Sequence, residues 1–172
     1  YCYDVVSPYA YLGLHSLQKV RPTWKHELIL RPVLLGGILK ESGNPPPPTV
    51  PNKFRFVQTD VARRAKGLDL PFQFPASFPP RTVTPMRLLT TVGNSAEAKQ
   101  LEALTGILFH KMFADGVDLN DLDVLRDACR ELEGVSETEV SHWMDSIDAP
   151  HTKEQLVVST GDAVKRGAFG AP

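Results

Sequence analysis

Cysteine is scarce in this chain, and the few thiols limit its chemistry. Its 172 residues include two cysteines, Cys2 and Cys129, which lie far apart in the sequence. They form neither a Cys-x-x-Cys pair nor a spacing typical of a metal site, so a disulfide framework is not expected. A reducing, intracellular compartment is the expectation that this cysteine usage favours.

Long hydrophobic runs and an excess of charge are lacking as well. No apolar stretch approaches the ~20 residues that cross a bilayer, and no signal-peptide pattern is present. The net charge of −1, with 23% charged residues, provides no general attraction to nucleic acid or to a membrane surface. With 42% hydrophobic residues the chain can instead bury a core of its own, as one domain or two small lobes.

The beginning of the chain is patterned as a strand, a helix and a second strand. Residues 1–6 are aromatic and β-branched, which predicts a short buried strand. Ser7 follows as a helix N-cap with Pro8 at the first helical position, and residues 9–20 have the apolar spacing of a helix. Residues 26–35 are rich in aliphatic side chains and predict a second strand. This spacing predicts a right-handed βαβ unit with parallel strands.

The middle of the chain is patterned as helices separated by proline-rich loops. Four consecutive prolines at residues 45–48 predict a stiff surface loop, and a second proline-rich connector covers residues 71–85. Between them, residues 54–66 have helical spacing. Capping patterns predict further helix starts at Asn94-x-x-Glu97, Asn120-x-x-Asp123, Ser136-x-x-Glu139 and Thr152-x-x-Gln155. A sheet fold with a helical insertion is therefore expected, with a last helix over residues 152–166 and both chain ends cut within the fold.

The strand-to-helix corner reads Ser7-Pro8-Tyr9-Ala10, and its serine is the first candidate for chemistry. In many thiol-handling folds a Cys-x-x-Cys pair occupies such a corner, whereas here a serine and an alanine take the outer places. A hydroxyl at a helix N-terminus lies among free backbone amides and the positive end of the helix dipole, which stabilise an anion such as a thiolate. The local pattern alone favours the simpler interpretation that Ser7 only caps the helix.

Several other polar side chains leave two interpretations open. Asn44 ends a Gly-Asn turn beside the polyproline loop and Lys53 lies near a helix start, so each is either a ligand-binding group or an ordinary surface residue. Asp4 either orients the corner or is a buried, hydrogen-bonded acid, and Tyr9 and Tyr11 either line a pocket or pack in the core. No metal site is predicted, because no supported ligand spacing relates the histidines His15, His26, His110, His142 and His151.

Four blocks of the sequence together resemble the kappa-class glutathione transferases. They are Tyr-Asp-Val-Val-Ser-Pro-Tyr-Ala-Tyr-Leu-Gly at residues 3–13, residues 31–38, residues 42–53 and the closing Gly-Ala-Phe-Gly-Ala-Pro at residues 167–172. These blocks follow the order of that family, so the resemblance spans the whole chain. The bacterial 2-hydroxychromene-2-carboxylate isomerases share the Ser-Pro corner and the closing Gly-x-Pro. Disulfide oxidoreductases of the DsbA type share the fold.

The resemblance implies an α/β fold, a thioredoxin-like lobe with a large inserted all-helical domain as in DsbA. The lobe would comprise residues 1–35 and 149–172, incomplete in this chain, and the insertion would comprise residues 36–148. It also implies a homodimer in mitochondria or peroxisomes, where family members that resemble this chain are found. No nucleic-acid partner and no membrane span are expected.

The resemblance also assigns roles to five residues. Ser7 would donate a hydrogen bond to the sulfur of glutathione and so favour its thiolate. Asn44 and Lys53 would hold the carboxylate end of the tripeptide. Ala171 would pair through its backbone with the cysteinyl part of glutathione, beside a cis Pro172.

The implied function is a glutathione transferase that forms the glutathione thiolate for conjugation to small electrophiles and for peroxide reduction. Glutathione is then a co-substrate, and no resident cofactor or metal is expected. One alternative is a glutathione-dependent 2-hydroxychromene-2-carboxylate isomerase, and another is a glutathione-binding module without catalysis. A disulfide oxidoreductase is rejected, because thiol–disulfide exchange has no relay without two exchangeable sulfurs at the corner.

Overall fold

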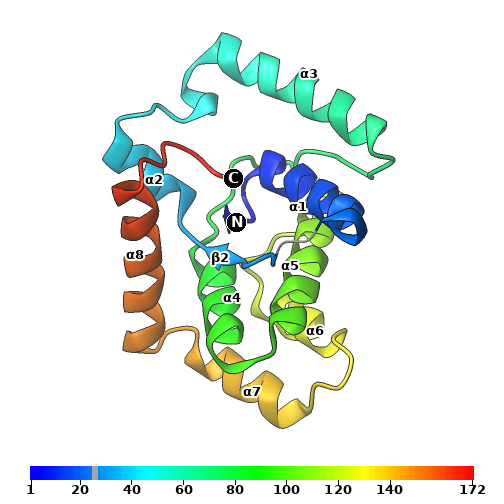
Figure 1. Ribbon diagram of the computed structural model, residues 1–172, viewed down its shortest axis with the longest axis vertical. Coiled ribbons are helices and arrows are strands. Elements are labelled where there is room, and N and C mark those ends of the chain that lie inside the picture. Colours follow the sequence, from blue (N-terminus) through cyan, green and yellow to red (C-terminus); the bar gives the residue numbers. More distant parts are fainter. Residues whose placement is uncertain (25–26) are drawn as a thin grey trace.

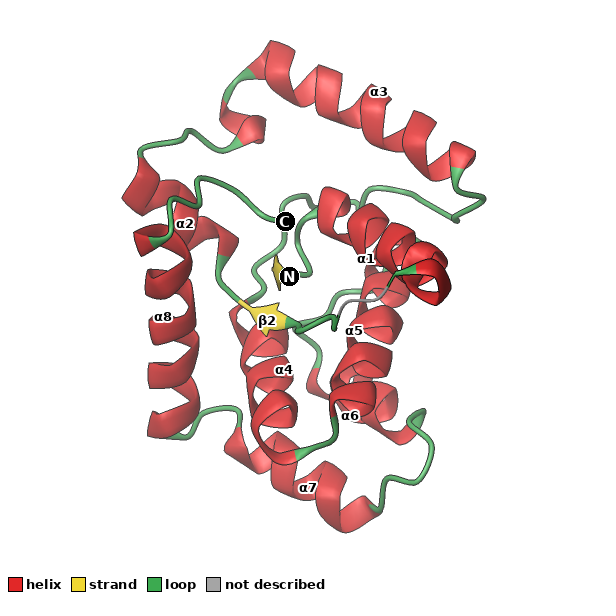
Figure 2. Ribbon diagram, viewed as in Figure 1, coloured by secondary structure: helices red, strands yellow, loops and turns green. Residues whose placement is uncertain are grey.

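The computed structural model describes residues 1–24 and 27–172 and shows a short parallel sheet surrounded by helices (Figures 1 and 2). Strand β1 (Cys2–Tyr3) pairs in parallel with strand β2 (Arg31–Pro32). Cys2 lies opposite Arg31, and Tyr3 lies opposite Pro32. The predicted order of strand, helix and parallel strand is therefore confirmed.

Both strands are shorter than the sequence predicts. The predicted strands cover residues 1–6 and 26–35, and residue 26 lies outside the described residues. After Tyr3 the chain turns, because the Asp4 carbonyl accepts a hydrogen bond from the backbone N–H of Ser7 (2.9 Å). Strand propensity alone does not extend a strand, since each residue also needs a partner on the neighbouring strand.

Eight α-helices and two 3₁₀ turns are found in the described residues. The α-helices are α1 (Pro8–Val20), α2 (Leu35–Ser42), α3 (Pro51–Gly67), α4 (Val83–Ser95), α5 (Ala98–Phe113), α6 (Leu122–Arg130), α7 (Glu137–Ser146) and α8 (Pro150–Lys165). The 3₁₀ turns are η1 (Arg21–Thr23) and η2 (Pro47–Thr49). Helix α8 packs against α2 and α4, whereas α3 lies at the edge of the molecule, in contact with α1 and η2 (Figure 1).

Helix α4 corrects the predicted extent of the second proline-rich connector. The sequence predicts a connector over residues 71–85, but α4 begins at Val83. Pro85 lies in the first helical turn, where a missing N–H costs no intrahelical hydrogen bond. A proline that the sequence pattern assigns to a loop can therefore lie in the first turn of a helix.

The capping patterns predict one helix start correctly and misplace three others. Ser136 caps α7 in a complete capping box with Glu139, as predicted. Thr152 is instead a buried residue inside α8, where its hydroxyl lies 3.3 Å from that of Thr91. The starts predicted at Asn94, Asn120 and Thr152 are wrong, and the observed N-caps are Glu97, Asp121 and Ala149.

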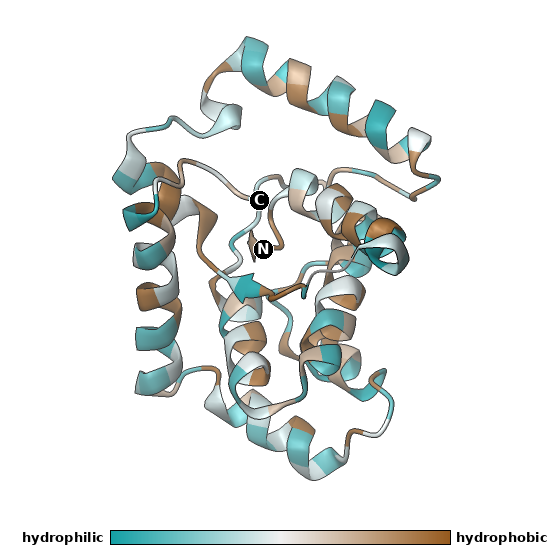
Figure 3. Cartoon of the chain, in the orientation of Figure 1, coloured by the Kyte–Doolittle hydropathy of each residue, from teal (hydrophilic) through white to brown (hydrophobic). Residues whose placement is uncertain are grey.

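The largest hydrophobic core joins β1 to the helices around it. Figure 3 shows hydrophobic and hydrophilic residues mixed along the helices, as expected for helices that bury one face. The ring of Phe109 on α5 lies 6.2 Å from that of Tyr3 and 5.7 Å from that of Tyr11, between centroids. The Tyr3 hydroxyl also hydrogen-bonds Thr105 Oγ1 (2.7 Å). Helix α5 therefore supports both β1 and α1, the two elements that flank the Ser-Pro corner.

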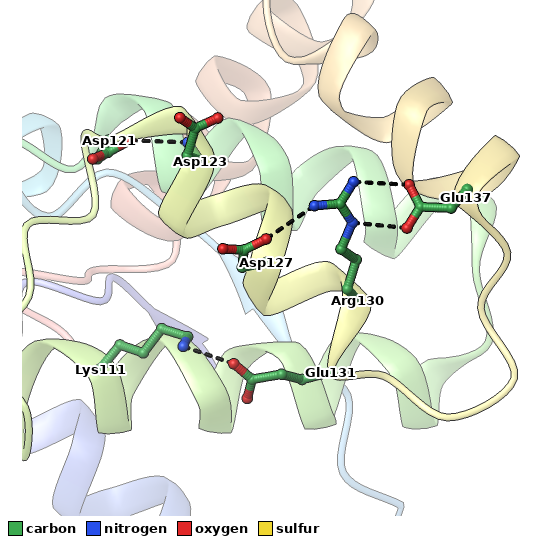
Figure 4. Close-up of polar contacts among 7 residues, drawn as sticks. All are labelled: Lys111, Asp121, Asp123, Asp127, Arg130, Glu131 and Glu137. Carbon is green, nitrogen blue, oxygen red and sulfur yellow. Dashed lines mark hydrogen bonds and ion pairs between the residues drawn. The ribbon is translucent and has the colours of Figure 1, made fainter.

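Exposed ion pairs join α5, α6 and α7 at the surface (Figure 4). Arg130, at the end of α6, donates from Nε to Oε1 of Glu137 (2.7 Å) and from Nη2 to Oε2 (3.0 Å). These hydrogen bonds from Arg130 lower the pKa of the Glu137 carboxyl. Lys111 pairs with Glu131 at 2.7 Å. Because pairs exposed to water contribute little free energy, they help to orient the helices more than they stabilise the fold.

The boundaries of the predicted lobe and insertion stay a prediction. Tyr3 and Leu156 of the predicted lobe belong to the same core cluster as Leu104 and Trp143 of the predicted insertion. No helix in the described part of the chain is long and apolar enough to cross a membrane.

Candidate active site

A cavity of about 710 Å³ lies where segments far apart in the sequence meet. Its wall comprises the Ser-Pro corner, the start of α2, the proline-rich loop, the first turns of α3, the segment before α4 and the end of the chain. The volume falls within the ~300–1,000 Å³ typical of small-molecule sites. Of the five residues that the resemblance singles out, Ser7, Asn44, Lys53 and Ala171 line the cavity, and the exposed Pro172 does not.

Ser7 is held at the N-terminus of α1 by three hydrogen bonds. Its backbone N–H donates to the Asp4 carbonyl, and its Oγ accepts from the backbone N–H of Ala10 (3.2 Å), which makes it the N-cap that the sequence predicts. The hydroxyl donates to the carbonyl of Ala171 (2.9 Å), at the other end of the chain. The Ala171-Pro172 peptide bond is cis. In Figure 1 the C-terminal end of the chain accordingly lies near the beginning of α1.

Asn44 and Lys53 lie together on another segment of the cavity wall. Asn44 follows Gly43, whose φ of 69° ends α2 in the left-handed conformation that glycine readily adopts. The Asn44 amide donates from Nδ2 to the Phe169 carbonyl (2.7 Å), and Lys53 Nζ donates to Asn44 Oδ1 (3.3 Å) and to the Pro45 carbonyl (3.5 Å). Among the described residues, no carboxylate pairs with the Lys53 ammonium, so its charge is available to an anionic ligand.

The sequence left the role of Asp4 open. In the structure Asp4 lines the cavity, three residues before Ser7 in the chain. Its side chain is 2% exposed. Oδ1 accepts from the backbone N–H of Val6 (3.1 Å), and Oδ2 accepts from that of Leu35 (2.8 Å), the first residue of α2. Burial raises the pKa of the Asp4 carboxyl to about 6, against its ordinary value of 3.8. Asp4 is therefore the buried, hydrogen-bonded acid that the sequence allowed.

This titration predicts how stability depends on pH. The folded chain holds the Asp4 proton more tightly than the unfolded chain, so ionising Asp4 destabilises the fold as the pH rises from about 4 to about 6. Asp4→Asn removes the titration, and its free energy of unfolding relative to that of the unaltered protein should rise over this interval. Urea unfolding of both proteins between about pH 4 and about pH 7 measures the difference. A difference that stays constant with pH would contradict the prediction.

Most of the remaining cavity wall is apolar and aromatic, and Arg81 and Thr82 add a charged and a polar side chain to it. Phe54, in the first turn of α3, stacks on Phe78 with ring centroids 6.0 Å apart, and Phe74 packs edge-on against both. Sequence analysis did not single out these phenylalanines, although Phe74 and Phe78 occupy the proline-rich connector that now forms one wall. Sequence analysis left the roles of two tyrosines open. In the structure Tyr9 lines the cavity and Tyr11 packs in the core.

No cysteine lines this cavity in the parts of the chain that the structure describes. Cys129 is buried in the core, where desolvation raises the pKa of its thiol to about 12. Cys2 packs against a smaller cluster formed by Val33, Ile38 and Ala163. Neither of these cysteines therefore supplies a sulfur to the cavity at the corner. The described residues also gather no group of three or more metal-ligating side chains, and His26 lies outside them.

Comparison with known proteins assigns the fold to a family. A family model described as a DSBA-like thioredoxin domain matches residues 2–172. The solved structure of 2-hydroxychromene-2-carboxylate isomerase superposes with a TM-score of 0.78 at 20% identity, over 99% of this chain and 81% of that chain. The class that the fold and the site define is thus the DsbA-like thioredoxin class, and the predicted fold is confirmed.

The family within this class follows from sequence identity. Glutathione S-transferase kappa 1 from Rattus norvegicus is 33% identical over 99% of this chain and 76% of the relative, and the Homo sapiens protein gives the same values. A 2-hydroxychromene-2-carboxylate isomerase from Pseudomonas sp. (strain C18) is 26% identical over 99% of this chain and 77% of the relative. The chain belongs to the kappa-class glutathione transferase family.

Proposed function

We propose that this chain is a glutathione transferase in which Ser7 stabilises the thiolate of bound glutathione. The observation that carries the proposal is the position of the Ser7 hydroxyl at the N-terminus of α1, in the wall of a cavity that contains no thiol of its own among the described residues. An ordinary thiol has a pKa near ~8.5 and is mostly protonated at neutral pH. A hydrogen bond from Ser7 and the positive end of α1 both favour the charged form.

The hydroxyl of Ser7 has a single hydrogen, which it donates to the Ala171 carbonyl in the structure. In the proposed complex the cysteinyl N–H of glutathione donates to that carbonyl, and the hydroxyl hydrogen turns toward the sulfur. Its oxygen continues to accept from the N–H of Ala10, so the hydrogen rotates while the oxygen stays in place. In this proposal, binding of glutathione breaks the hydrogen bond between the Ser7 hydroxyl and the Ala171 carbonyl.

The reaction then follows ordinary thiolate chemistry. The thiol proton leaves to solvent, and the sulfur uses an electron pair to form a bond with the electrophilic carbon. The leaving group, chloride in a chlorinated nitroaromatic compound, departs with the electrons of its former bond. The aromatic wall formed by Phe54 and Phe78, against which Phe74 packs, fits an apolar electrophile beside the sulfur. With a peroxide as electrophile, the thiolate attacks one oxygen, the O–O bond breaks, and the other oxygen leaves as an alkoxide or hydroxide that takes a proton from solvent. The thiol of a second glutathione then attacks the sulfenic acid, which gives glutathione disulfide and releases water.

The proposal is tested by measuring binding and turnover on the same preparation. Calorimetry gives the affinity for glutathione, and absorbance follows its conjugation to 1-chloro-2,4-dinitrobenzene. Binding together with turnover is expected. Binding without turnover would contradict the proposal in favour of a glutathione-binding module, and the absence of both would exclude a glutathione site.

Lys53→Met tests the proposed carboxylate site. Removal of the ammonium from the cavity wall is expected to raise the KM for glutathione by about three- to tenfold, because a hydrogen bond at an exposed position such as Lys53 contributes about 0.5–1.5 kcal/mol and Asn44 remains. Since the electrophile does not contact this carboxylate, its KM should change little. Lys66→Met removes the same charge from the far end of α3, outside the cavity, and serves as the matched control. Equal effects of the two substitutions would exclude Lys53 from the site.

A glutathione-dependent isomerase is the second candidate function. It is favoured by the match, over 99% of this chain, to proteins named 2-hydroxychromene-2-carboxylate isomerase. In this reaction the thiolate adds to the substrate and is expelled again after isomerisation, so glutathione is recovered. The change in absorbance of a 2-hydroxychromene-2-carboxylate solution distinguishes the isomerase from the transferase. An isomerase converts the substrate with only a catalytic amount of glutathione, because glutathione is recovered after each turnover.

The assembly, the compartment and the need for a cofactor belong to the same proposal. We propose a homodimer that functions in mitochondria or peroxisomes, as the resemblance to the kappa class implies. Glutathione is the co-substrate, and no resident cofactor is required. Sedimentation of the purified protein measures the dimer, and fractionation of cells tests the compartment.

A further inference from the structure

Helices α1 and α3 carry two different parts of the proposed glutathione site. Ser7 is the N-cap of α1, Lys53 lies in the first turn of α3, and both residues line the cavity. Figure 1 shows α3 at the edge of the molecule, next to α1. A small apolar cluster joins the two helices and is separate from the largest core; its buried members are Leu12 on α1 and Val57, Val61 and Ala65 on α3.

One hydrogen bond also joins these two helices. The hydroxyl of Tyr9, in the first turn of α1, donates to Oδ2 of Asp60 on α3 (2.9 Å). Within residues 1–24 and 27–172, no second hydrogen bond or ion pair links α1 to α3. The same Asp60 oxygen accepts from Nε of Arg64, four residues further along α3 (2.8 Å). Asp60 is therefore the polar link between the helix that carries Ser7 and the helix that carries Lys53.

The surroundings of Asp60 favour a strong link. Its side chain is 13% exposed, whereas that of Arg64 is 62% exposed. Hydrogen bonds from Arg64 and from Tyr9 hold the pKa of the Asp60 carboxyl below its ordinary value, so the carboxylate is charged at neutral pH. A hydrogen bond to a charged acceptor is shorter and stronger than one between neutral groups. Tyr9 lines the cavity, and Asp60 does not.

The position of Asp60 on α3 relates this link to the binding site. Lys53, Val57 and Asp60 follow one another at positions i, i+4 and i+7, which places them on one face of the helix. Val57 packs in the cluster with Leu12, so this face is turned toward α1. Apolar packing has no preferred direction and leaves α3 free to slide along α1, whereas a hydrogen bond fixes a distance and a direction.

We propose that the hydrogen bond between Tyr9 and Asp60 sets the span of the glutathione site, with Asp60 as a positioning residue. The two ends of this span are the Ser7 hydroxyl, which takes the sulfur, and the Lys53 ammonium, which takes the glycine carboxylate. This inference rests on the proposed function, because both ends of the span come from it. Asp60 lies outside the cavity wall and acts without touching glutathione.

Asp60→Ala is the decisive substitution, because it removes the acceptor from a position outside the cavity. We expect the KM for glutathione to rise by about three- to tenfold, the range that the loss of one hydrogen bond produces. Loss of a negative charge alone favours an anionic ligand, so the change in charge cannot cause this rise. Asp60→Asn keeps an acceptor oxygen for Tyr9 and should restore most of the affinity.

The monoethyl ester of glutathione, in which the glycine carboxylate is blocked, tests whether Asp60 acts through the span. This ester lacks the group that Lys53 would hold, so it does not need both ends of the site. Asp60→Ala should therefore raise the KM for glutathione by a clearly larger factor than the KM for the ester. Equal factors for the two thiols would refute the proposed role of Asp60.

Tyr11→Phe and Arg64→Met are the matched controls. Tyr11 lies on α1 outside the cavity, and its hydroxyl donates to the Pro71 carbonyl (3.2 Å). Arg64→Met removes the ion pair within α3 and leaves the link between Tyr9 and Asp60 in place. Each control should keep the KM for glutathione within about twofold, as expected for an exposed pair. If either control raises this KM as much as Asp60→Ala, the link is not what sets the span.

A double-mutant cycle of stability separates this inference from the proposed function, because it needs no glutathione. Urea unfolding of Tyr9→Phe, Asp60→Ala and the double variant should give losses that are not additive, since either substitution breaks the same hydrogen bond. Additive losses would refute the link, even in a protein that turns over glutathione. If the unaltered protein neither binds nor converts glutathione, the proposed function and its span fail, while the cycle still shows whether Tyr9 and Asp60 join the two helices.

Discussion

Ser7→Ala is expected to lower kcat/KM for glutathione conjugation by about ten- to a hundredfold. A hydrogen bond to a charged partner contributes about 1.5–3 kcal/mol, and each 1.4 kcal/mol corresponds to a factor of ten. Alanine removes the donor to the sulfur, so the pKa of the bound thiol should rise and the thiolate fraction at neutral pH should fall. Affinity for glutathione should change little, because Asn44, Lys53 and the backbone of Ala171 remain.

The substitution also removes a helix cap, and the two effects must be separated. Ser7 Oγ accepts from the N–H of Ala10, and loss of such a cap costs about 1 kcal/mol of stability. Ser136→Ala removes the equivalent cap of α7, where Oγ accepts from the N–H of Glu139. This control should lose similar stability and keep its turnover. Ser7→Thr, which retains a hydroxyl and a cap, should keep a measurable rate. A full rate in Ser7→Ala would remove Ser7 from the mechanism.

Phe109→Ala is expected to lower the free energy of unfolding by about 3–5 kcal/mol. Phe109 is fully buried, and its ring packs against those of Tyr3, Tyr11 and Phe113. Its removal leaves a cavity between α5 and the two elements that carry the Ser-Pro corner. Because domains of this kind have a total stability of about 5–15 kcal/mol, the loss would unfold a sizeable fraction of molecules on mild heating.

Urea unfolding measures this loss, and turnover per folded molecule shows whether the corner also moves. Val158→Ala on α8 is the control, because this valine is 54% exposed and its truncation should change stability by no more than about 0.5 kcal/mol. A loss below about 1 kcal/mol in Phe109→Ala would mean that the aromatic cluster relaxes to fill the space.

Elements with local signals were predictable from the sequence. Helix α1 follows from Ser7 as cap, Pro8 in the first turn and apolar spacing up to Val20, all of which lie within a few residues of one another. The strands were predicted in the right order but too long, because strand length depends on a partner distant in the sequence. Helix α4 was missed, because Pro85 reads as loop unless its position in the first turn is known.

The resemblance identified the site residues, whereas local chemistry did not. Considered singly, Ser7 is a cap, Asn44 a turn residue and Lys53 a surface lysine. The fold brings these three residues and Ala171 to one cavity, and no local sequence pattern predicts that arrangement. The aromatic wall around Phe78 was missed for the same reason, since a proline-rich connector shows no spacing from which its packing follows.

The sequence by itself determined the absence of paired thiols at the corner, the parallel strand order and the serine cap at the start of α1. These features depend on residue identity and on contacts within a few positions. Only the tertiary structure decided that the Ser7 hydroxyl meets the Ala171 carbonyl and that the Asp4 carboxylate accepts a hydrogen bond from the N–H of Leu35 at the start of α2. Those contacts join residues that lie 164 and 31 positions apart in the sequence, so they form only when the packing of the core brings their segments together.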